Sequence, residues 1–352
     1  MSIVHNPFGK LPGGETATLY TLTNARGESV SITNYGGIIT AIRVMDRAGQ
    51  LADVVLGCDS VEKYVPNNGY LGALIGRVGN RINRGQCTLN GQKLQLAANS
   101  NGHHLHGGNV GFDQKLWAAQ TQAGEGYDQL TLTTFSPDGE EHYPGNLEVK
   151  VTYRWNDRSE LSIHYQAQSD QDTLCNLTNH SYFNLRGEGS GLVNDHRIQI
   201  NADRFTVVDK DCIPTGELRP VDGTPFDLRK PKRIQDGLDQ LETDEQLGFG
   251  GGYDHNFALN GSGMRRVAAV CEPESGRRME VYTDMPGVQF YGGNMLDGTM
   301  QGKSGHGYMP REGLCLETQF YPDSINHPNF PDSVLRAGAK YDYTTVYAFS
   351  AE

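Results

Sequence analysis

This chain contains no closely spaced pair of cysteines and no long apolar run, and its first residues do not have the pattern of a leader segment. Its six cysteines are scattered without C-x-x-C spacing, so we find no thiol motif for a metal and expect reduced thiols. No stretch approaches the roughly 20 apolar residues of a membrane span, and the first residues lack the basic start and apolar core of a secretory signal. We therefore expect a cytoplasmic protein with no membrane partner.

Net positive charge is lacking as well. Lysine and arginine total 30 against 42 aspartates and glutamates, which gives a formal net charge of -12. This balance argues against nucleic acid as a partner and makes a neutral small molecule easier to accommodate. The nucleophile elbow, the dinucleotide glycine fingerprint and the phosphate loop are also absent, which removes the commonest hydrolases and nucleotide-binding enzymes.

Glycine, in contrast, is abundant at 44 residues, while charged residues make up only 20%. This composition is typical of many short strands joined by turns. In residues 147–155 apolar or aromatic side chains alternate with polar ones, and the alternation resumes over residues 161–167 after a turn. The pattern predicts an antiparallel hairpin with one buried face.

Similar short strands are expected along the whole chain, at residues 19–22, 29–33, 38–44, 129–135, 197–200, 267–271, 278–282 and 343–349. Helical pattern is sparse, and single turns or short helices are expected at residues 60–64, 70–75 and 234–238. No repeat or linker divides the chain, so residues 1–352 are predicted to form a single domain. The expected fold is all-β, a large antiparallel β-sandwich with few short helices.

Residues 179–184, Asn-His-Ser-Tyr-Phe-Asn, gather an imidazole, two amides, a hydroxyl and two aromatic rings. They follow residues 174–178, which have the pattern of a half-buried strand, so His180 would sit where a strand leaves the core. Because an imidazole titrates near neutrality, His180 is a candidate proton donor or acceptor. Taken alone, a hydrogen-bonded structural histidine explains the position as well.

Four further segments combine polar side chains with glycines or aromatic rings, an arrangement that suits a sugar. They are residues 75–82 with Asn80 and Arg81, 103–108 with His106, 251–257 with Asp254, and 286–294 with Gln289. The His-x-His of residues 104–106 lacks acidic or sulfur partners at a matching spacing, so we expect no metal site there. A surface turn or a plain core strand is the competing explanation for each segment.

Glu317 interrupts an apolar run, so its carboxyl is expected to be partly buried. Desolvation raises the pKa of a carboxyl toward neutrality, which a general acid or base requires. Together with His180 it forms a pair of proton carriers without a nucleophile or cofactor. Such a pair suits a reaction that only moves protons, such as opening and reclosing a hemiacetal ring, whereas glycoside hydrolysis usually needs two carboxylates.

A series of motifs runs in order along nearly the whole chain: DVVLG, GRVGNRI, HLHGGNVGFD, NLTNHSYFNL, GYDHNF, PGVQFYGGN, GLCLETQFYPDSINHPNFP and YDYTTVYAF. On these motifs the sequence resembles the aldose 1-epimerase (galactose mutarotase) family. The resemblance implies the galactose mutarotase-like supersandwich fold and the interconversion of the α and β anomers of free hexoses such as galactose and glucose. It also implies that no metal or nucleotide cofactor takes part, and we expect a monomer or homodimer.

The resemblance further implies the roles of individual residues. His180 would be the general acid at the ring oxygen and Glu317 the general base at the anomeric hydroxyl. The sugar-contacting positions would be Asn80, Arg81, His106, Asp254 and Gln289. Gly79 stands where Ala is usual and Phe320 where some members have Asn, so the sugar preference stays open.

Two other functions stay open at this point. A 1-epimerase of a phosphorylated hexose would need a basic cluster at the pocket rim, for which Arg77, Arg81 and Arg84 are the compact candidates. A carbohydrate-binding module that kept the fold without turnover would not need a buried titrating pair such as His180 and Glu317.

Overall fold

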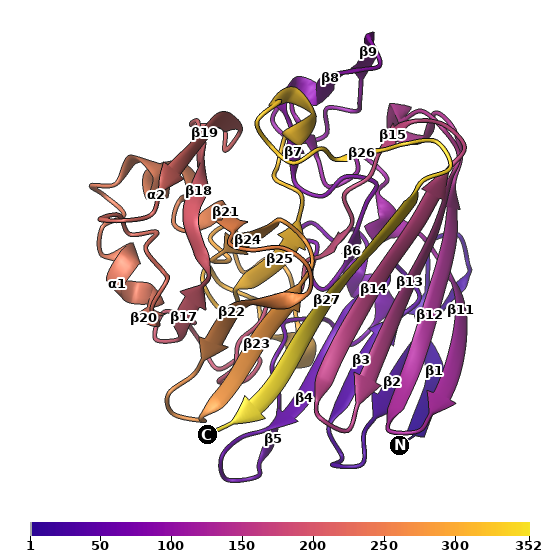
Figure 1. The fold of residues 1–352 in the computed structure, drawn as a ribbon. Helices are drawn as coiled ribbons and strands as arrows, with labels where there is room; N and C mark the ends of the chain where they lie inside the picture. The colour runs from indigo at the N-terminus through magenta and orange to yellow at the C-terminus, as the bar shows by residue number, and fades with distance from the viewer. Residues whose placement is uncertain (1) are drawn as a thin grey trace.

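The computed structural model describes residues 2–352, whose strands pair antiparallel in a series of sheets (Figure 1). A nine-stranded sheet forms one side of the molecule in the order β11-β12-β13-β14-β27-β23-β22-β17-β20. Its strands are β11 (Ala118–Gly124), β12 (Tyr127–Ser136), β13 (Leu147–Asn156), β14 (Glu160–Ser169), β27 (Lys340–Ala351), β23 (Arg277–Thr283), β22 (Arg265–Cys271), β17 (Arg197–Ile200) and β20 (Lys232–Arg233).

Two five-stranded sheets lie against it. One consists of β1 (Ser2–Lys10), β2 (Thr16–Thr23), β3 (Ser29–Thr33), β4 (Ile39–Met45) and β5 (Leu51–Asp53). The other has the order β19 (Pro214–Pro220), β18 (Ala202–Val208), β21 (Asp254–Leu259), β24 (Gly287–Tyr291) and β25 (Cys315–Gln319). Short two-stranded ribbons complete the described sheets: β6 (Leu74–Ile75) with β16 (Thr178–Asn179), β7 (Arg81–Ile82) with β10 (His104–Leu105), β8 (Gln86–Leu89) with β9 (Gln92–Gln95), and β15 (Thr173–Leu174) with β26 (Val334–Leu335).

Helical structure is sparse in residues 2–352. The α-helices are α1 (Ile234–Leu238) and α2 (Glu245–Gly250), and the 3-10 turns are η1 (Val61–Tyr64), η2 (Asn83–Gly85), η3 (Phe112–Gln114), η4 (Glu140–His142), η5 (Lys303–Gly305) and η6 (Ser324–Asn326). None of the helices in this range is long and apolar enough to cross a membrane.

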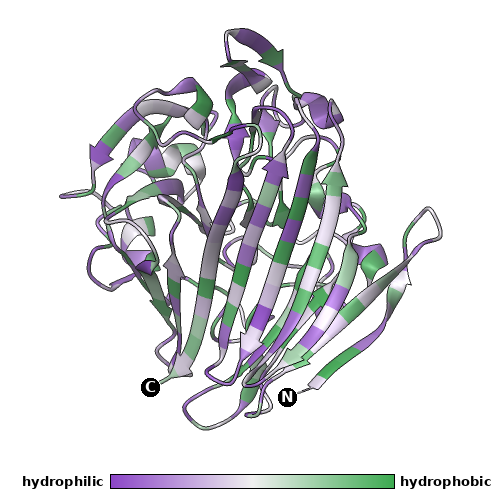
Figure 2. Cartoon of the chain, turned by 45° about the vertical axis from the view of Figure 1, so that its right-hand side comes forward, coloured by the Kyte–Doolittle hydropathy of each residue, from purple (hydrophilic) through white to green (hydrophobic). Residues whose placement is uncertain are grey.

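The alternation seen in the sequence becomes a two-faced sheet. Strand β13 buries Leu147, Val149 and Val151 on one face and exposes Glu148 and Lys150 on the other. Figure 2 shows the same alternation as green and purple bands along neighbouring strands. Burying one face of each strand is what holds the large sheet against its neighbours.

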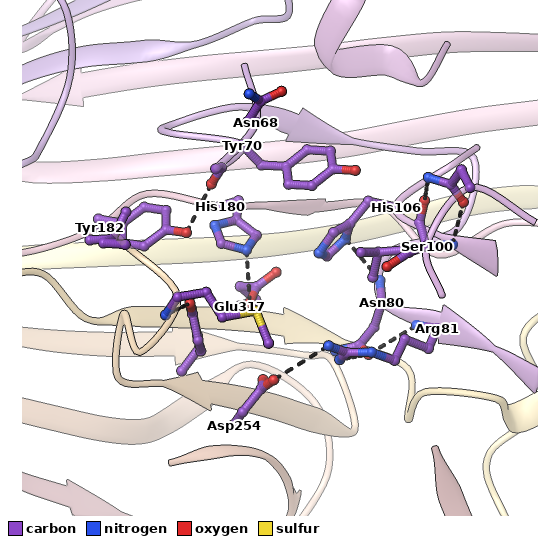
Figure 3. A pocket seen from close by; sticks show the side chains of 16 residues that line it. Asn68, Tyr70, Asn80, Arg81, Ser100, His106, His180, Tyr182, Asp254 and Glu317 are labelled. Atoms are coloured by element: carbon purple, nitrogen blue, oxygen red, sulfur yellow. Dashed lines mark hydrogen bonds and ion pairs between the residues drawn. The ribbon is translucent and has the colours of Figure 1, made fainter. Parts of the chain in front are cut away.

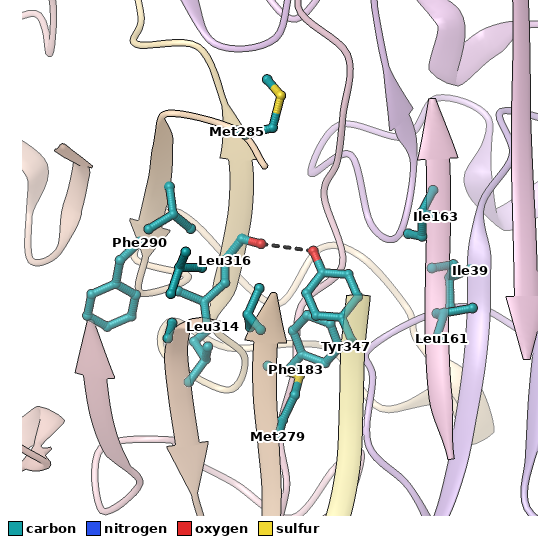
Figure 4. Packing of buried hydrophobic residues seen from close by; sticks show 14 of the residues in the cluster. Ile39, Leu161, Ile163, Phe183, Met279, Met285, Phe290, Leu314, Leu316 and Tyr347 are labelled. Atoms are coloured by element: carbon teal, nitrogen blue, oxygen red, sulfur yellow. Dashed lines mark hydrogen bonds between the residues drawn. The ribbon is translucent and has the colours of Figure 1, made fainter. Parts of the chain in front are cut away.

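The main core lies between the nine-stranded sheet and both five-stranded sheets. One continuous cluster of buried side chains includes Ile39 of β4, Ile163 of β14, Met279 of β23 and Leu316 of β25 (Figure 4). Tyr347 of β27 belongs to it and donates its hydroxyl hydrogen to the carbonyl of Leu316 at 2.9 Å. Strand β25 is therefore anchored to the large sheet through its apolar face.

These observations confirm the predicted all-β class and the hairpin of residues 147–167. The predicted turns at residues 60–64 and 234–238 are η1 and α1. Of the single turn or short helix expected at residues 70–75, the structure has a turn at residues 71–72 and no helix: Tyr70 has φ 53° and Gly72 φ 68°, and the segment then enters β6. Residues 174–178 are not a half-buried strand, because the ends of β15 and β16 fall within them and every residue is buried.

Candidate active site

The polar face of β21, β24 and β25 forms one side of a cavity. In the register of these strands Glu317 lies opposite Gln289, and in the next row Tyr291 lies opposite both Cys315 and Asp254. Because side chains alternate along a strand, these residues share one face, while the residues between them face the apolar core. The sheet thus holds a carboxylate pair, an amide and a thiol on one rigid surface.

Short ribbons supply the opposite side. His180 follows β16 directly, and its backbone is held at both ends, since its N–H donates to Ala73 and its carbonyl accepts from Gly72. Asn80 and His106 flank the β7–β10 ribbon, both with positive φ, and bond to each other twice. In the second bond the backbone N–H of Asn80 donates to Nδ1 of His106 at 3.1 Å. Figure 3 shows the side chains converging on the cavity from both sides.

His180 and Glu317 face each other across a short gap. The distance from Nε2 of His180 to Oε1 of Glu317 is 3.7 Å, and their relative exposures are 5% and 2%. Burial lowers the pKa of His180 to about 4, and burial together with the nearby charge of Asp254 raises the pKa of Glu317 well above its usual value. The second oxygen of Glu317, Oε2, is buried without a hydrogen-bond partner among the described residues.

Aromatic rings surround His180 on several sides. The ring centroid of Tyr182 lies 5.0 Å from that of His180, that of Tyr70 6.0 Å and that of Tyr291 6.1 Å. The ring of His106 stands edge-on at 5.2 Å. This packing removes water from the imidazole and is the physical reason for its lowered pKa. The cavity beside it has a volume of about 330 Å³, within the range of small-molecule sites.

Asp254 is clamped between two partners. Its Oδ1 accepts from the amide of Gln289 at 2.7 Å, and its Oδ2 lies 3.5 Å from Nη2 of Arg81. A carboxylate fixed in this way presents its remaining lone pairs in a set direction.

The expected site residues that line the cavity are Asn80, Arg81, His106, His180, Asp254 and Glu317. Gln289 is not among the lining residues: it stands behind Asp254 and orients it. In residues 179–184 the amide side chains form hydrogen bonds within the protein. Asn179 accepts from Ser181, and Asn184 donates to the carbonyl of Glu312.

Sequence reasoning missed part of the lining. The additional residues are Asn68, Gly69, Tyr70, Asn99, Ser100, Leu105, Met295 and Leu296. Residues 68–70, Asn-Gly-Tyr, carry the same signal as the segments that were found, an amide and an aromatic ring beside a glycine. The expected helix over residues 70–75 concealed it.

The two histidines of the His-x-His motif lie in different surroundings. The ring of His104 is buried and bonds the carbonyl of Ala97 and the hydroxyl of Tyr143, which is a structural role. The backbone turns at His106, with φ 49°, so its ring points into the cavity instead of lying on the face that His104 uses.

Three possible metal ligands approach one another in the cavity. One ligand atom each from His106, His180 and Glu317 lies within 4.8 Å of the others. The tautomer of His106 disfavours coordination: because Nδ1 accepts from the N–H of Asn80, the proton of the neutral ring is on Nε2, where a metal needs a lone pair. As arranged, His106 offers a hydrogen-bond donor to the cavity.

The arginines considered for a phosphate are dispersed. Arg77 is buried away from the cavity and donates to the carbonyls of Pro137 and Pro144 at 2.9 and 3.0 Å. Arg84 is exposed and does not line the cavity. Arg81 lines it but is already paired with a carboxylate. The structure therefore does not favour a site for a phosphorylated sugar.

Comparison with known proteins agrees with this architecture. A family model described as aldose 1-epimerase matches residues 18–348, and the chain belongs to that family. It is 47% identical to galactose mutarotase of Bos taurus over 99% of both chains, and 39% identical to aldose 1-epimerase of Escherichia coli over 97% of both. The crystal structure of galactose 1-epimerase from Lactobacillus acidophilus superimposes with a TM-score of 0.88 at 28% identity, covering 99% of both chains.

Proposed function

We propose that this protein is an aldose 1-epimerase that interconverts the α and β anomers of free hexoses, galactose and glucose among them. The observation that carries the proposal is the buried imidazole of His180 facing the buried carboxyl of Glu317 at 3.7 Å beside a sugar-sized cavity. Family membership supports the same reaction. The chemistry needs only proton transfer, which two such groups supply.

In the proposed mechanism the pair holds one proton. The Glu317 carboxylate takes the proton of the anomeric hydroxyl while the His180 imidazolium donates its Nε2 proton to the ring oxygen. The bond between the anomeric carbon and the ring oxygen breaks, and an open-chain aldehyde forms. After rotation of the aldehyde, Glu317 returns its proton to the carbonyl oxygen, His180 takes one from the chain hydroxyl, and the ring closes on the other face.

Burial makes the ionised forms of the pair reactive. Because burial lowers the pKa of His180 to about 4, its imidazolium is a strong proton donor. Because the pKa of Glu317 is raised, its carboxylate is a strong acceptor. When the proton of the pair is on His180, it moves downhill through the sugar to Glu317 during ring opening and returns during ring closure. Because the same pKa shifts place the resting proton on Glu317, this reactive ionised form is the minor one.

The remaining polar groups are proposed to hold the sugar. Asn80, Arg81 and Asp254 reach the cavity with amide, guanidinium and carboxylate groups suited to hydroxyls, and His106 adds an N–H donor. For Gln289 we keep a role in substrate binding, exerted through its hydrogen bond to Asp254.

We further propose that the whole chain acts as a single domain in the cytoplasm, as a monomer or homodimer. One continuous apolar cluster that runs from Leu22 to Phe349 supports the single domain. Six free cysteines fit a reducing compartment. Light scattering of the purified protein measures the oligomeric state, and a trimer or larger assembly would contradict this part of the proposal.

Polarimetry tests the activity directly. Freshly dissolved α-D-galactose and α-D-glucose change their optical rotation as they equilibrate, and catalytic amounts of the protein are expected to accelerate both changes. The rate should survive exhaustive dialysis against a chelator, because no metal takes part in the proposed steps. If neither sugar equilibrates faster with the protein than without it, the proposal is wrong.

A further inference from the structure

Strand β25 contacts both nitrogens of the His180 ring. Cys315 and Glu317 are two residues apart and point to the same face of the strand. Sγ of Cys315 lies 3.5 Å from Nδ1 of His180, while Oε1 of Glu317 lies 3.7 Å from Nε2. One strand therefore brackets the imidazole, with a carboxyl on the nitrogen that faces the cavity and a thiol on the other.

We propose that Cys315 is a positioning residue: its sulfur accepts the Nδ1–H of His180 and so leaves Nε2 as the nitrogen that exchanges protons with the sugar. The inference rests on the proposed acid role of His180. A neutral imidazole carries one N–H, and the hydrogen bond at one nitrogen decides which nitrogen keeps it.

The direction of this hydrogen bond follows from the reaction cycle. At ring closure the neutral His180 must accept a proton at Nε2, so Nε2 needs a lone pair and the proton must stay on Nδ1. If the thiol donated to Nδ1 instead, Nε2 would already be protonated and could accept nothing. The neighbouring His106 is held in the opposite tautomer, since its Nδ1 accepts from the backbone of Asn80.

A thiol suits this position better than a stronger acceptor would. Cys315 is fully buried, and burial raises its pKa well above the usual value, so the sulfur stays neutral. A carboxylate there would stabilise the imidazolium and weaken it as an acid, whereas a neutral sulfur orients the ring at little electrostatic cost. The carbonyl of His180 also acts on its own ring, where it opposes the lowering of the imidazole pKa, and it receives the N–H of Gly72 at 3.0 Å.

Histidine NMR combined with kinetics tests the inference. In protein labelled at the histidine nitrogens, ¹⁵N shifts report the tautomer of neutral His180, whose signal is assigned by its loss in His180→Gln. We expect Nδ1–H in the wild type and in Cys315→Ser, where a hydroxyl oxygen replaces the sulfur as acceptor. In Cys315→Ala we expect a mixture of tautomers and a kcat about 10-fold lower, with KM unchanged.

Cys175→Ala is the matched control, because Cys175 is an equally buried thiol in the apolar core. It should change neither the tautomer nor kcat. An Nε2–H tautomer in the wild type, or a Cys315→Ala protein that keeps pure Nδ1–H, would overturn the inference. A loss of rate that Ser does not rescue would indicate a packing role instead. Full activity in His180→Gln would refute the proposed acid while leaving the tautomer measurement to decide on Cys315 separately.

Discussion

At the scale of single residues, burial lowers the pKa of His180 and raises the pKa of Glu317. It disfavours the charged form of each, which makes the imidazolium more acidic and the carboxylate more basic. The ionised forms that the proposed mechanism uses are therefore the ones that burial disfavours, and proton transfer from His180 to Glu317 through a bound sugar would neutralise both groups. Such shifts of pKa are typical of enzyme sites.

Replacing Glu317 by Gln should separate its reactivity from its packing. The amide keeps the shape but accepts no proton, so we expect the mutarotation rate to fall at least ~100-fold. The free energy of unfolding should not fall, because a neutral amide is cheaper to bury than a carboxylate. Polarimetry and urea unfolding measure the two effects. Glu148→Gln, on the exposed face of β13, is the control, and a near-normal rate in Glu317→Gln would remove its role as base.

The pH dependence of kcat/KM should show where the pair holds its single proton. As the pH falls through about 4, the pKa of His180, both groups become protonated, Glu317 accepts nothing and the rate drops. On the alkaline side the shared proton is lost only above the raised pKa of Glu317, so the rate should stay high beyond the usual range of a carboxyl. A profile that instead rises through the ordinary pKa of histidine would contradict this assignment.

The sequence identified these two residues because each breaks a local pattern: Glu317 interrupts an apolar run, and His180 follows one. The position of Gln289 behind Asp254 was not visible in the sequence, since it depends on the register of β21 against β24. Tyr70 was missed for a different reason, because the helical pattern expected over residues 70–75 concealed the amide and aromatic signal of residues 68–70. The fold places its ring centroid 6.0 Å from that of His180.

At the scale of elements, β25 turns one face to the apolar core and the other to the cavity. Leu316, like Leu314 just before the strand, belongs to the apolar core, whereas Cys315 and Glu317 face His180. Neither face is exposed, which explains why the segment appeared in the sequence as an apolar run with a single break. Strand periodicity of two therefore predicted which residues share a face, but not what covers each face.

Leu316→Ala should lower the stability of the protein without lowering its kcat. Truncating this buried side chain leaves a cavity between β25 and the large sheet, and we expect the free energy of unfolding to fall by about 2–5 kcal/mol. The kcat of the folded fraction should remain close to normal, because Glu317 points away from the cavity created. Urea unfolding and polarimetry at low temperature measure both. Leu316→Met serves as the volume-conserving control, and a variant that loses kcat without losing stability would contradict the division.

Turns were less predictable than strands. Residues 70–75 have helical composition but contain a left-handed Tyr70 and Gly72, because this segment must turn sharply beneath His180 before β6 begins. Helix α2 was overlooked, although Asp244 caps it by accepting from Leu247 and Gly251 ends it with φ 63°. Cap signals of this kind are short, and a sequence rich in glycine contains many that do not mark the end of a helix.

At the scale of the whole molecule, the fold assembles a site from segments distant in the chain. Strands β21, β24 and β25 bring Asp254 and Glu317 together, and the ribbons β6–β16 and β7–β10 add His180 and His106 (Figure 3). The alternation of hydropathy predicted a sandwich, because a sandwich requires only that each strand has one buried face. The order of strands in three sheets required the structure, because alternation does not specify partners.

The net charge of the molecule should select neutral sugars over phosphorylated ones. A formal charge of -12 repels anions, and the single arginine that lines the cavity among residues 2–352, Arg81, is already paired with Asp254. We expect kcat/KM for galactose 6-phosphate to be at least ~10-fold below that for galactose at low ionic strength, and the difference to shrink as added salt screens the charges. Polarimetry with each sugar at several salt concentrations measures this difference in kcat/KM. D-Fucose, which is D-galactose without the 6-hydroxyl, separates charge from contacts at that carbon: if charge is decisive, D-fucose remains a good substrate. Equal turnover of the phosphate, or a deficit that salt leaves unchanged, would show that the field of the protein does not set its substrate class.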